Sequence, residues 1–306
     1  MEDDLGYGLP HIEGSLLYLA ALADEAEAAG FPQRQPDASA WPGRARRYTV
    51  PIRNGRLIAK ELSLDTHGFV LLRNQTAVVN FYDEQEVRAI YYPEVERLLK
   101  RAAGVTKVVV FAHDVRSIPK SRKGEKSVRE PVAAVHNDYT IKSGPEHVRE
   151  LLKSDEAEAR LKNRFVEINV WRPIRGPVQS TPLALCDSRS IAPQDLVPTD
   201  LKHEVYMLRF SSAHRWFYFP EMEADEVLLI KGFDSMEDGR ARFTAHAAFE
   251  DPTAPSFAPA RESIEARALV FYGPEPNAEA DRCTPGNGVT ARSIQVVKSA
   301  CRLFKD

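Results

Sequence analysis

The chain has 306 residues, of which 43% are hydrophobic and 28% charged, and its formal net charge is −3. This length can bury a sizeable core in one large domain or two small ones. The near-neutral charge argues against nucleic-acid binding, which usually needs a strongly basic face, and no apolar run approaches the roughly 20 residues of a membrane-spanning helix. We therefore expect a globular protein that binds neither nucleic acid nor membrane.

The first part of the chain predicts a helix followed by strands. Residues 14–29 are rich in Ala, Leu and Glu and stop at Gly30, so they predict a helix, and the Pro-rich residues 31–45 predict a linker. The Asn54-Gly55 dipeptide within YTVPIRNGRL is typical of a β-hairpin turn. Residues 68–81, GFVLLRNQTAVVNF, predict two further strands.

A longer helix and an apolar strand come next. Residues 83–104 predict a helix that is interrupted at Pro93 and ends at Gly104. TKVVVFAHDV, residues 106–115, predicts a buried strand. The basic segment 116–131, which contains Gly and Pro, predicts either a solvated connection or a mobile lid.

Short strands dominate the second half of the chain, after one more predicted helix at 144–163. The predicted strands are residues 164–174, 181–191, 204–212, 215–220, 226–234, 241–250 and 262–272. A parallel α/β fold would need helices between these strands, and the sequence offers none there. The order predicts a mainly β fold, a sandwich or jelly-roll barrel with helices packed outside it.

The amino terminus and the cysteines indicate a reducing compartment. The acidic start MEDDLGYGLP lacks the basic residues and apolar core of a signal peptide. Cys186, Cys283 and Cys301 are far apart and form no CxxC motif, so we expect reduced thiols. We expect a cytoplasmic protein.

A candidate metal site lies in VAAVHNDYTIKSG, residues 132–144, where an apolar run ends at His136. Asp138 follows two residues later, and side-chain alternation places both on one face of an extended chain. A ferrous facial triad needs two histidines and one carboxylate on one side of the metal. About one His-x-acid pair is expected by chance in a chain of this composition, and His11-Ile12-Glu13 is a second one. A surface histidine is therefore the alternative interpretation of His136.

The second histidine of a triad has to come from a later segment. His147 falls on a polar helix and His203 at the entry of a charged loop. His214 and His246 both have strand-rich surroundings, although the aromatic neighbours of His214 also suit a partly buried wall residue. We favour His246, because an arginine follows it at a suitable distance.

That arginine, Arg261, opens the last predicted strand fifteen residues after His246. Alternation places Ser263, Glu265 and Arg267 on the same face of that strand as Arg261. A dicarboxylate co-substrate needs a bidentate cation at its far end, and the guanidinium group suits that role. A surface arginine after a Pro-rich loop is the alternative.

Eight segments together resemble one known family, and they occur in the same order from about residue 45 to 272. They are ELSLDTHGFVLL, NFYDEQEVRAIYYPEVERLLK, VHNDYT, INVWRPI, TPLALCD, FPEMEADEVLLIKGFDS, ARFTAHAAFEDPTAP and ARESIEARALVFY. The chain is similar to the hydroxylase/desaturase-like enzymes of natural-product pathways, which resemble the iron(II)/2-oxoglutarate dioxygenases. The resemblance implies a double-stranded β-helix, cupin-like core at 46–272 within one dioxygenase domain, flanked by 1–45 and 273–306.

The resemblance also implies the cofactors and their residues. Iron(II) would be bound by His136, Asp138 and His246, with 2-oxoglutarate and O2 as co-substrates. Arg261 would bind the 2-oxoglutarate carboxylate together with Ser263 of an Arg-x-Ser pair. Arg267 is the alternative clamp, because the segment between His246 and Arg261 is long and Pro-rich. The reaction would be hydroxylation or desaturation of a small natural-product-like molecule.

Several residues could line a substrate pocket. They are Tyr139, Asn169, Trp171, Arg172 and Trp216. Alternation separates Asn169 and Trp171 from Arg172, so only one of these sets can face the pocket. Buried aromatic residues are more often part of a core.

Two other classes of function compete with the oxygenase. A non-catalytic β-sandwich binding protein with structural histidines would bind no stoichiometric iron. A hydrolase lacks support, because the chain has no Gly-x-Ser-x-Gly, His-Glu-x-x-His or Gly-rich phosphate loop. A homo-oligomer is compatible with the sequence.

Overall fold

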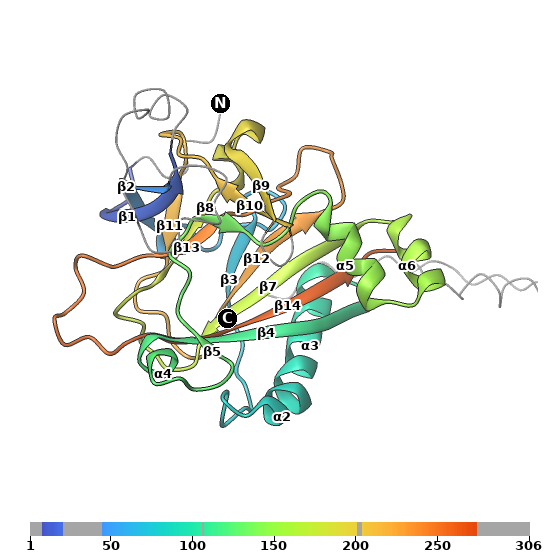
Figure 1. Ribbon diagram of the computed structural model, residues 1–306, viewed down its shortest axis with the longest axis horizontal. Coiled ribbons are helices and arrows are strands. Elements are labelled where there is room, and N and C mark those ends of the chain that lie inside the picture. The colour runs from blue at the N-terminus through green and yellow to red at the C-terminus, as the bar shows by residue number, and fades with distance from the viewer. Residues whose placement is uncertain (1–7, 21–44, 106, 201–203, 274–306) are drawn as a thin grey trace, which may run out of the picture. The chain divides into compact units, whose positions relative to one another are not determined.

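Two β-sheets form the framework of the computed structural model, which describes residues 8–20, 45–105, 107–200 and 204–273 (Figure 1). The eight-stranded sheet contains, in spatial order, β1 (His11–Leu19), β2 (Ala45–Asn54), β11 (Trp216–Tyr218), β8 (Leu183–Cys186), β13 (His246–Ala248), β6 (His136–Asn137), β10 (Glu204–Leu208) and β9 (Leu196–Asp200). The six-stranded sheet contains β3 (Phe69–Arg73), β12 (Glu226–Asp234), β7 (Phe165–Pro173), β14 (Glu262–Phe271), β4 (Lys107–Ser117) and β5 (Val128–Arg129). Neighbouring strands are antiparallel except for the parallel pairs β2–β11 and β4–β5.

The two sheets share one apolar core and the larger sheet also encloses a second one. Trp171 and Phe69 of the smaller sheet pack in one cluster with Leu185 and Phe217 of the larger sheet. The larger sheet also curls back on itself, because isolated bridges join Leu17 to Ala134 and Leu19 to Arg209. These facing, curled sheets form the jelly-roll core predicted for the chain, and the mainly β fold class is confirmed.

Helices cover the face of the smaller sheet that points away from the larger one. A π-helical turn (Val87–Tyr91) links α2 (Glu84–Glu86) to α3 (Tyr92–Ala103), and the turn falls just before Pro93. Proline has no backbone N–H to donate, which explains the irregular ladder before it. Apolar side chains of α3, including Leu98 and Leu99, pack on β4, β7 and β12. Gly104 ends this helix with a positive φ of 65°.

The remaining helices are short. They are α4 (Ile118–Arg122), α5 (Ser143–Leu151) and α6 (Ser154–Leu161), with 3₁₀ turns at Gly55–Ile58, Ser188–Ser190 and Pro193–Asp195. The single helix predicted at 144–163 is therefore two helices, because Leu152 is extended and interrupts the pattern. None of the helices in the described residues is long and apolar enough to cross a membrane.

Three local predictions are wrong. Residues 14–19 belong to strand β1 and not to a helix, because this segment pairs with β2 over nine residues and buries Leu16 and Tyr18 alternately. Pairing in the tertiary structure overrides the helix propensity of Ala and Leu. Residues 21–29, the rest of that predicted helix, lie outside the described residues.

The predicted hairpin at Asn54-Gly55 is absent, because Asn54 caps a 3₁₀ turn with its side chain and β2 pairs with β1 and β11. The second strand predicted within 68–81 is also absent. Its backbone N–H groups at Ala77 and Val79 are instead bound by the side chains of Glu94 and Glu86. Strand β9 was not predicted.

Candidate metal centre and its pocket

Two histidines meet across neighbouring strands of the larger sheet. His136 of β6 pairs directly with His246 of β13, and their ring centroids are 4.5 Å apart. Asp138 follows β6, and its Oδ1 lies 3.5 Å from Nε2 of His136. One ligand atom from each of the three residues lies within 4.8 Å of the others. Two imidazoles and one carboxylate at this spacing can ligate a single metal ion.

The backbone fixes which nitrogen of each histidine is available. Nδ1 of His136 lies 2.8 Å from the carbonyl oxygen of Ala134, and Nδ1 of His246 lies 3.3 Å from that of Thr244. A carbonyl can only accept a hydrogen bond, so each Nδ1 donates, which leaves Nε2 as the nitrogen that can bind a metal. Burial and the neighbouring His136 lower the pKa of His246 to about 4, so this ring is neutral at pH 7, as a metal ligand requires.

Asp138 is held through its second oxygen. Its Oδ2 accepts hydrogen bonds from Asn169 Nδ2 at 2.6 Å and from Arg267 Nε at 3.4 Å. Burial by itself would raise the pKa of Asp138, but the charges of Arg267 and His136 outweigh burial and hold that pKa well below its usual range. The carboxylate is therefore ionised and its Oδ1 is directed toward the histidine pair.

The other candidate histidines are engaged elsewhere. His214 is buried, with Nδ1 2.9 Å from Tyr18 Oη and Nε2 3.1 Å from Asp195 Oδ2, so both ring nitrogens have partners. His147 lies on α5, and its Nδ1 is 3.4 Å from Glu167 Oε2. His203 lies outside the described residues. Of the candidates within the described residues, only His246 is brought next to His136 and Asp138.

A small cavity of about 20 Å³ adjoins the two histidines. Its lining combines the histidines with one aromatic, several apolar and three charged side chains. The lining residues are Arg116, Val132, His136, Trp171, Leu183, His246, Ala248, Arg261 and Glu265. The cavity therefore brings Arg261 of the last predicted strand to the metal candidate, as the sequence pattern anticipated.

Arg261 is a buried cation that forms no ion pair with a carboxylate of the described residues. Its Nη1 donates to the carbonyl oxygen of Thr181 at 2.7 Å, and its Cζ lies 5.4 Å from the ring centroid of Trp171. Among the described residues it forms no ion pair, and its buried Nε has no hydrogen-bond partner. Burial and the nearby Arg116 lower the pKa of Arg261 to about 9. The Oγ of Ser263, on the same face of β14, is likewise buried without a partner in the described part of the chain.

Arg267 has the opposite environment. It donates to Asp114 at 2.8 Å, to Glu265 at 2.9 Å and to Asp138 at 3.4 Å. The charges of Asp138 and Glu265 outweigh burial and raise the pKa of Arg267. Three carboxylates bond this guanidinium group and already compensate its charge.

The predicted substrate residues are not all at the cavity. Asn169 holds Asp138, and Trp171 lines the cavity beneath Arg261. Arg172 points to the other face of β7, where it donates to the carbonyl oxygen of Ala224 and lies over the ring of Phe81. The predicted separation of Arg172 from Asn169 and Trp171 is thus observed.

Two predicted aromatic residues lie in apolar cores. Tyr139 packs with Phe165 and Phe233 and against His147. Trp216 belongs to the second core of the larger sheet and donates to Tyr18 Oη at 2.7 Å. Neither residue lines the cavity beside the histidines.

Sequence reasoning missed two charged residues of β4, namely Arg116, which lines the cavity, and Asp114, which accepts from Arg267. Strand β4 continues to Ser117 in the structure, so Arg116 lies opposite Ser263 and Asp114 opposite Glu265. The sequence pattern that could have revealed both residues is the alternation in HDVRS, which extends the predicted strand beyond residue 115.

Comparisons with known proteins indicate the family of this chain. The profile of the family described as Oxidoreductase/YMDC permease-like domain matches residues 16–271. Hydroxylase/desaturase CTB9 of Cercospora beticola is 33% identical over 274 residues, covering 79% of this chain and 84% of the relative. Fe(II)/2-oxoglutarate-dependent dioxygenase nvfI of Aspergillus novofumigatus is 34% identical over 241 residues, covering 74% and 84%.

A solved structure shares the fold as well as the sequence pattern. The iron and alpha-ketoglutarate-dependent endoperoxidase NvfI superimposes with a TM-score of 0.75 at 28% sequence identity. The superposition covers 86% of this chain and 99% of the other. Sequence and fold comparisons therefore lead to the same group of enzymes.

Proposed function

Because this chain belongs to the Oxidoreductase/YMDC permease-like domain family and is an iron(II)- and 2-oxoglutarate-dependent dioxygenase like its relatives, we propose that His136, Asp138 and His246 hold the iron. The observation that carries this assignment is the convergence of their three ligand atoms within 4.8 Å. Two neutral imidazoles and an ionised carboxylate are the donor set that suits non-haem iron(II). The Nδ1 hydrogen bonds, which leave Nε2 of each histidine for a metal, and the directed Oδ1 of Asp138 support the fit.

Arg261 and Ser263 bind the distal carboxylate of 2-oxoglutarate in this proposal. Both side chains are buried, Arg261 directly before β14 and Ser263 within it, and both carry polar atoms without a partner among the described residues. A buried cation is costly unless a counter-ion compensates it, and a carboxylate would supply both the charge and the acceptor. The Thr181 carbonyl and the Trp171 ring orient the guanidinium group for that contact. Arg267 is not the clamp, because Asp114, Glu265 and Asp138 already occupy it.

The protein residues supply binding, orientation and shielding. Iron(II) with 2-oxoglutarate and dioxygen supplies the decarboxylation of 2-oxoglutarate to succinate and the removal of hydrogen from a substrate C–H bond. His136, Asp138 and His246 would hold the metal. Val132, Leu183 and Ala248 line the cavity with apolar surface that excludes water from the histidines.

The finer features of the function are also proposals. The substrate is a small natural-product-like molecule that undergoes hydroxylation or desaturation, which the names of the relatives support. Residues 46–272 act as one dioxygenase domain, with 1–45 and 273–306 as extensions. We place the enzyme in the cytoplasm, without nucleic-acid or membrane partners, and a homo-oligomer is compatible with it. Tyr139, Arg172 and Trp216 stay predicted substrate residues, although their contacts favour structural roles.

An anaerobic titration tests the proposal directly. Iron(II) added to the protein with 2-oxoglutarate should give one equivalent of a complex with a weak visible charge-transfer absorption. Succinate should form when oxygen and a substrate are admitted. A protein that binds no stoichiometric iron and shows no absorption band would contradict the assignment and favour a non-catalytic binding protein.

A further inference from the structure

The orientation of Asp138 is set by residues outside the metal triad. We propose that Arg267 is a positioning residue that, with Asn169, fixes the Asp138 carboxylate in the orientation that metal binding requires. This inference rests on the proposed function, since it takes Asp138 as a metal ligand. It assigns to Arg267 a role distinct from binding 2-oxoglutarate.

The hydrogen bonds of Asp138 divide its two oxygens between two tasks. Oδ2 accepts from Asn169 at 2.6 Å and from Arg267 at 3.4 Å, while Oδ1 lies 3.5 Å from Nε2 of His136. With Oδ2 engaged by two donors, rotation of the carboxylate would break both contacts. Partners of this kind hold a ligand in the geometry for the metal before the metal arrives.

Arg267 is itself held in place by two further carboxylates. Asp114 and Glu265 lie directly opposite each other on β4 and β14, and both accept from Arg267, at 2.8 Å and 2.9 Å. Like charges directly across an antiparallel pair are destabilising unless they are compensated. Arg267 lies between them and compensates them, so its guanidinium group cannot move without exposing this repulsion.

A second layer anchors Asp114. Arg116 lies 3.4 Å and Arg129 3.3 Å from the Asp114 carboxylate. Arg129 belongs to β5, which follows the basic segment after β4. The chain of contacts therefore runs from β5 through Asp114 and Arg267 to Asp138.

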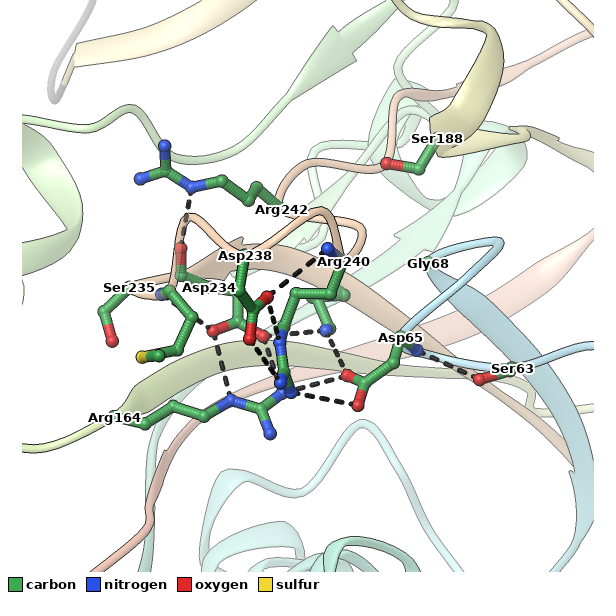
Figure 2. Close-up of polar contacts among 12 residues, drawn as sticks. Ser63, Asp65, Gly68, Arg164, Ser188, Asp234, Ser235, Asp238, Arg240 and Arg242 are labelled. Atoms are coloured by element: carbon green, nitrogen blue, oxygen red, sulfur yellow. Dashed lines mark hydrogen bonds and ion pairs between the residues drawn. The ribbon is translucent and has the colours of Figure 1, made fainter.

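A purely structural role for Arg267 would produce the same contacts, so the test must separate metal binding from stability. The chain offers a matched control in Arg164, which lies outside the metal site. Arg164 bonds Asp234 at 2.6 Å and Asp65 at 2.9 Å in a separate ion-pair cluster (Figure 2). Removal of either arginine takes one cation from a cluster of carboxylates, but of the two only Arg267 contacts Asp138.

The experiment measures the affinity for Co(II), a redox-inert substitute for iron, by its visible absorption in the absence of 2-oxoglutarate. We expect Arg267→Met to weaken Co(II) binding by about 10- to 100-fold and Arg267→Lys to recover part of that loss. Arg164→Met should bind Co(II) like the wild type, even if its melting temperature falls as much. Asn169→Ala should weaken Co(II) binding independently of Arg267.

Two results would overturn the proposal. One is a folded Arg267→Met variant that binds Co(II) within about twofold of the wild type. If Arg267→Met does not fold, unchanged Co(II) affinity in both Arg267→Lys and Asn169→Ala overturns it equally. His136→Ala separates this inference from the proposed function. If His136→Ala still binds Co(II), the proposed metal site is wrong. If His136→Ala loses Co(II) while the Arg267 and Asn169 variants keep it, the metal site stands and only the positioning role of Arg267 is wrong.

Discussion

Arg261, which directly precedes strand β14, and Arg267, which lies within it, are six positions apart and have opposite surroundings. Arg261 contacts a carbonyl and an aromatic ring and forms no ion pair with a described residue. Arg267 bonds three carboxylates. Burying a charge without a counter-ion costs several kcal/mol, so the uncompensated arginine is the one suited to a ligand, and the compensated one is suited to holding the structure.

The largest effects should come from the metal ligands that lie between these two regions. His136→Ala, Asp138→Ala and His246→Ala should each abolish iron binding and oxygenase turnover while keeping the fold, because two remaining ligands hold iron(II) weakly. Iron content after anaerobic loading and gel filtration measures this. His214→Ala is the control: it should lose stability, because Tyr18 and Asp195 lose their partner, and should keep iron. If His246→Ala retains iron and His214→Ala loses it, His214 and not His246 is the third metal ligand.

The two arginines should respond differently to 2-oxoglutarate. Arg261→Ala should weaken 2-oxoglutarate binding by about 2–5 kcal/mol, at least about 30-fold, because one partner of a buried charge pair is removed. Arg267→Ala should leave the 2-oxoglutarate affinity nearly unchanged once the metal site is saturated. Isothermal titration with 2-oxoglutarate at saturating Mn(II) checks both variants. The reverse pattern would assign the clamp to Arg267.

The sequence predicts the strands of the smaller sheet well. The predicted strands 164–174, 226–234 and 262–272 appear as β7, β12 and β14, because long apolar runs bounded by turns have few alternative structures. Strand β1 was predicted as a helix, since its Leu-rich composition is typical of a helix and its partner β2 is separated from it by a predicted linker. Pairing between distant segments is not encoded in a local window.

The same limit applies to the candidate site. Alternation predicts that Arg261 and Arg267 share a face, and this is observed. It cannot predict which of them is compensated, because Asp114, Glu265 and Asp138 come from three different segments. Only the fold brings these carboxylates around Arg267, whereas no carboxylate in the described part of the chain forms an ion pair with Arg261.

Beyond Arg267, toward α5, the interior contains a buried carboxyl group whose ionisation should affect stability. Burial raises the pKa of Glu167 to about 7, although His147 at 3.4 Å opposes the shift. The unfolded-state pKa of a glutamate is 4.5, so the raised pKa means that protonated Glu167 stabilises the folded state. This contribution to the free energy of unfolding is complete below about pH 4.5 and is lost as the pH rises through 7. Glu167 raises the pKa of His147 against the effect of burial, and this shift acts in the same direction.

Glu167→Gln should therefore flatten the pH dependence of stability. The wild-type free energy of unfolding should fall between pH 5 and pH 8 by an amount on the order of 3 kcal/mol from this group, and the variant should lack that contribution. Urea unfolding at several pH values measures it, with the exposed Glu158→Gln as the control. An unchanged slope in Glu167→Gln would show that Glu167 does not titrate in this range.

The smallest expected effect concerns Ser263, which tests the uncompensated end of β14 without disturbing its charge. The Ser263 Oγ is buried and has no hydrogen-bond partner among the described residues, so Ser263→Ala removes no protein contact and should leave the melting temperature unchanged or slightly raised. If Oγ donates to the distal carboxylate of 2-oxoglutarate, the same substitution should weaken that ligand by about 1.5–3 kcal/mol, as for other hydrogen bonds to charged groups. Titration of the Mn(II)-loaded variant with 2-oxoglutarate measures the change. Full affinity in Ser263→Ala would leave Arg261 as the sole clamp, whereas a stability loss without an affinity loss would show that Oγ serves the fold.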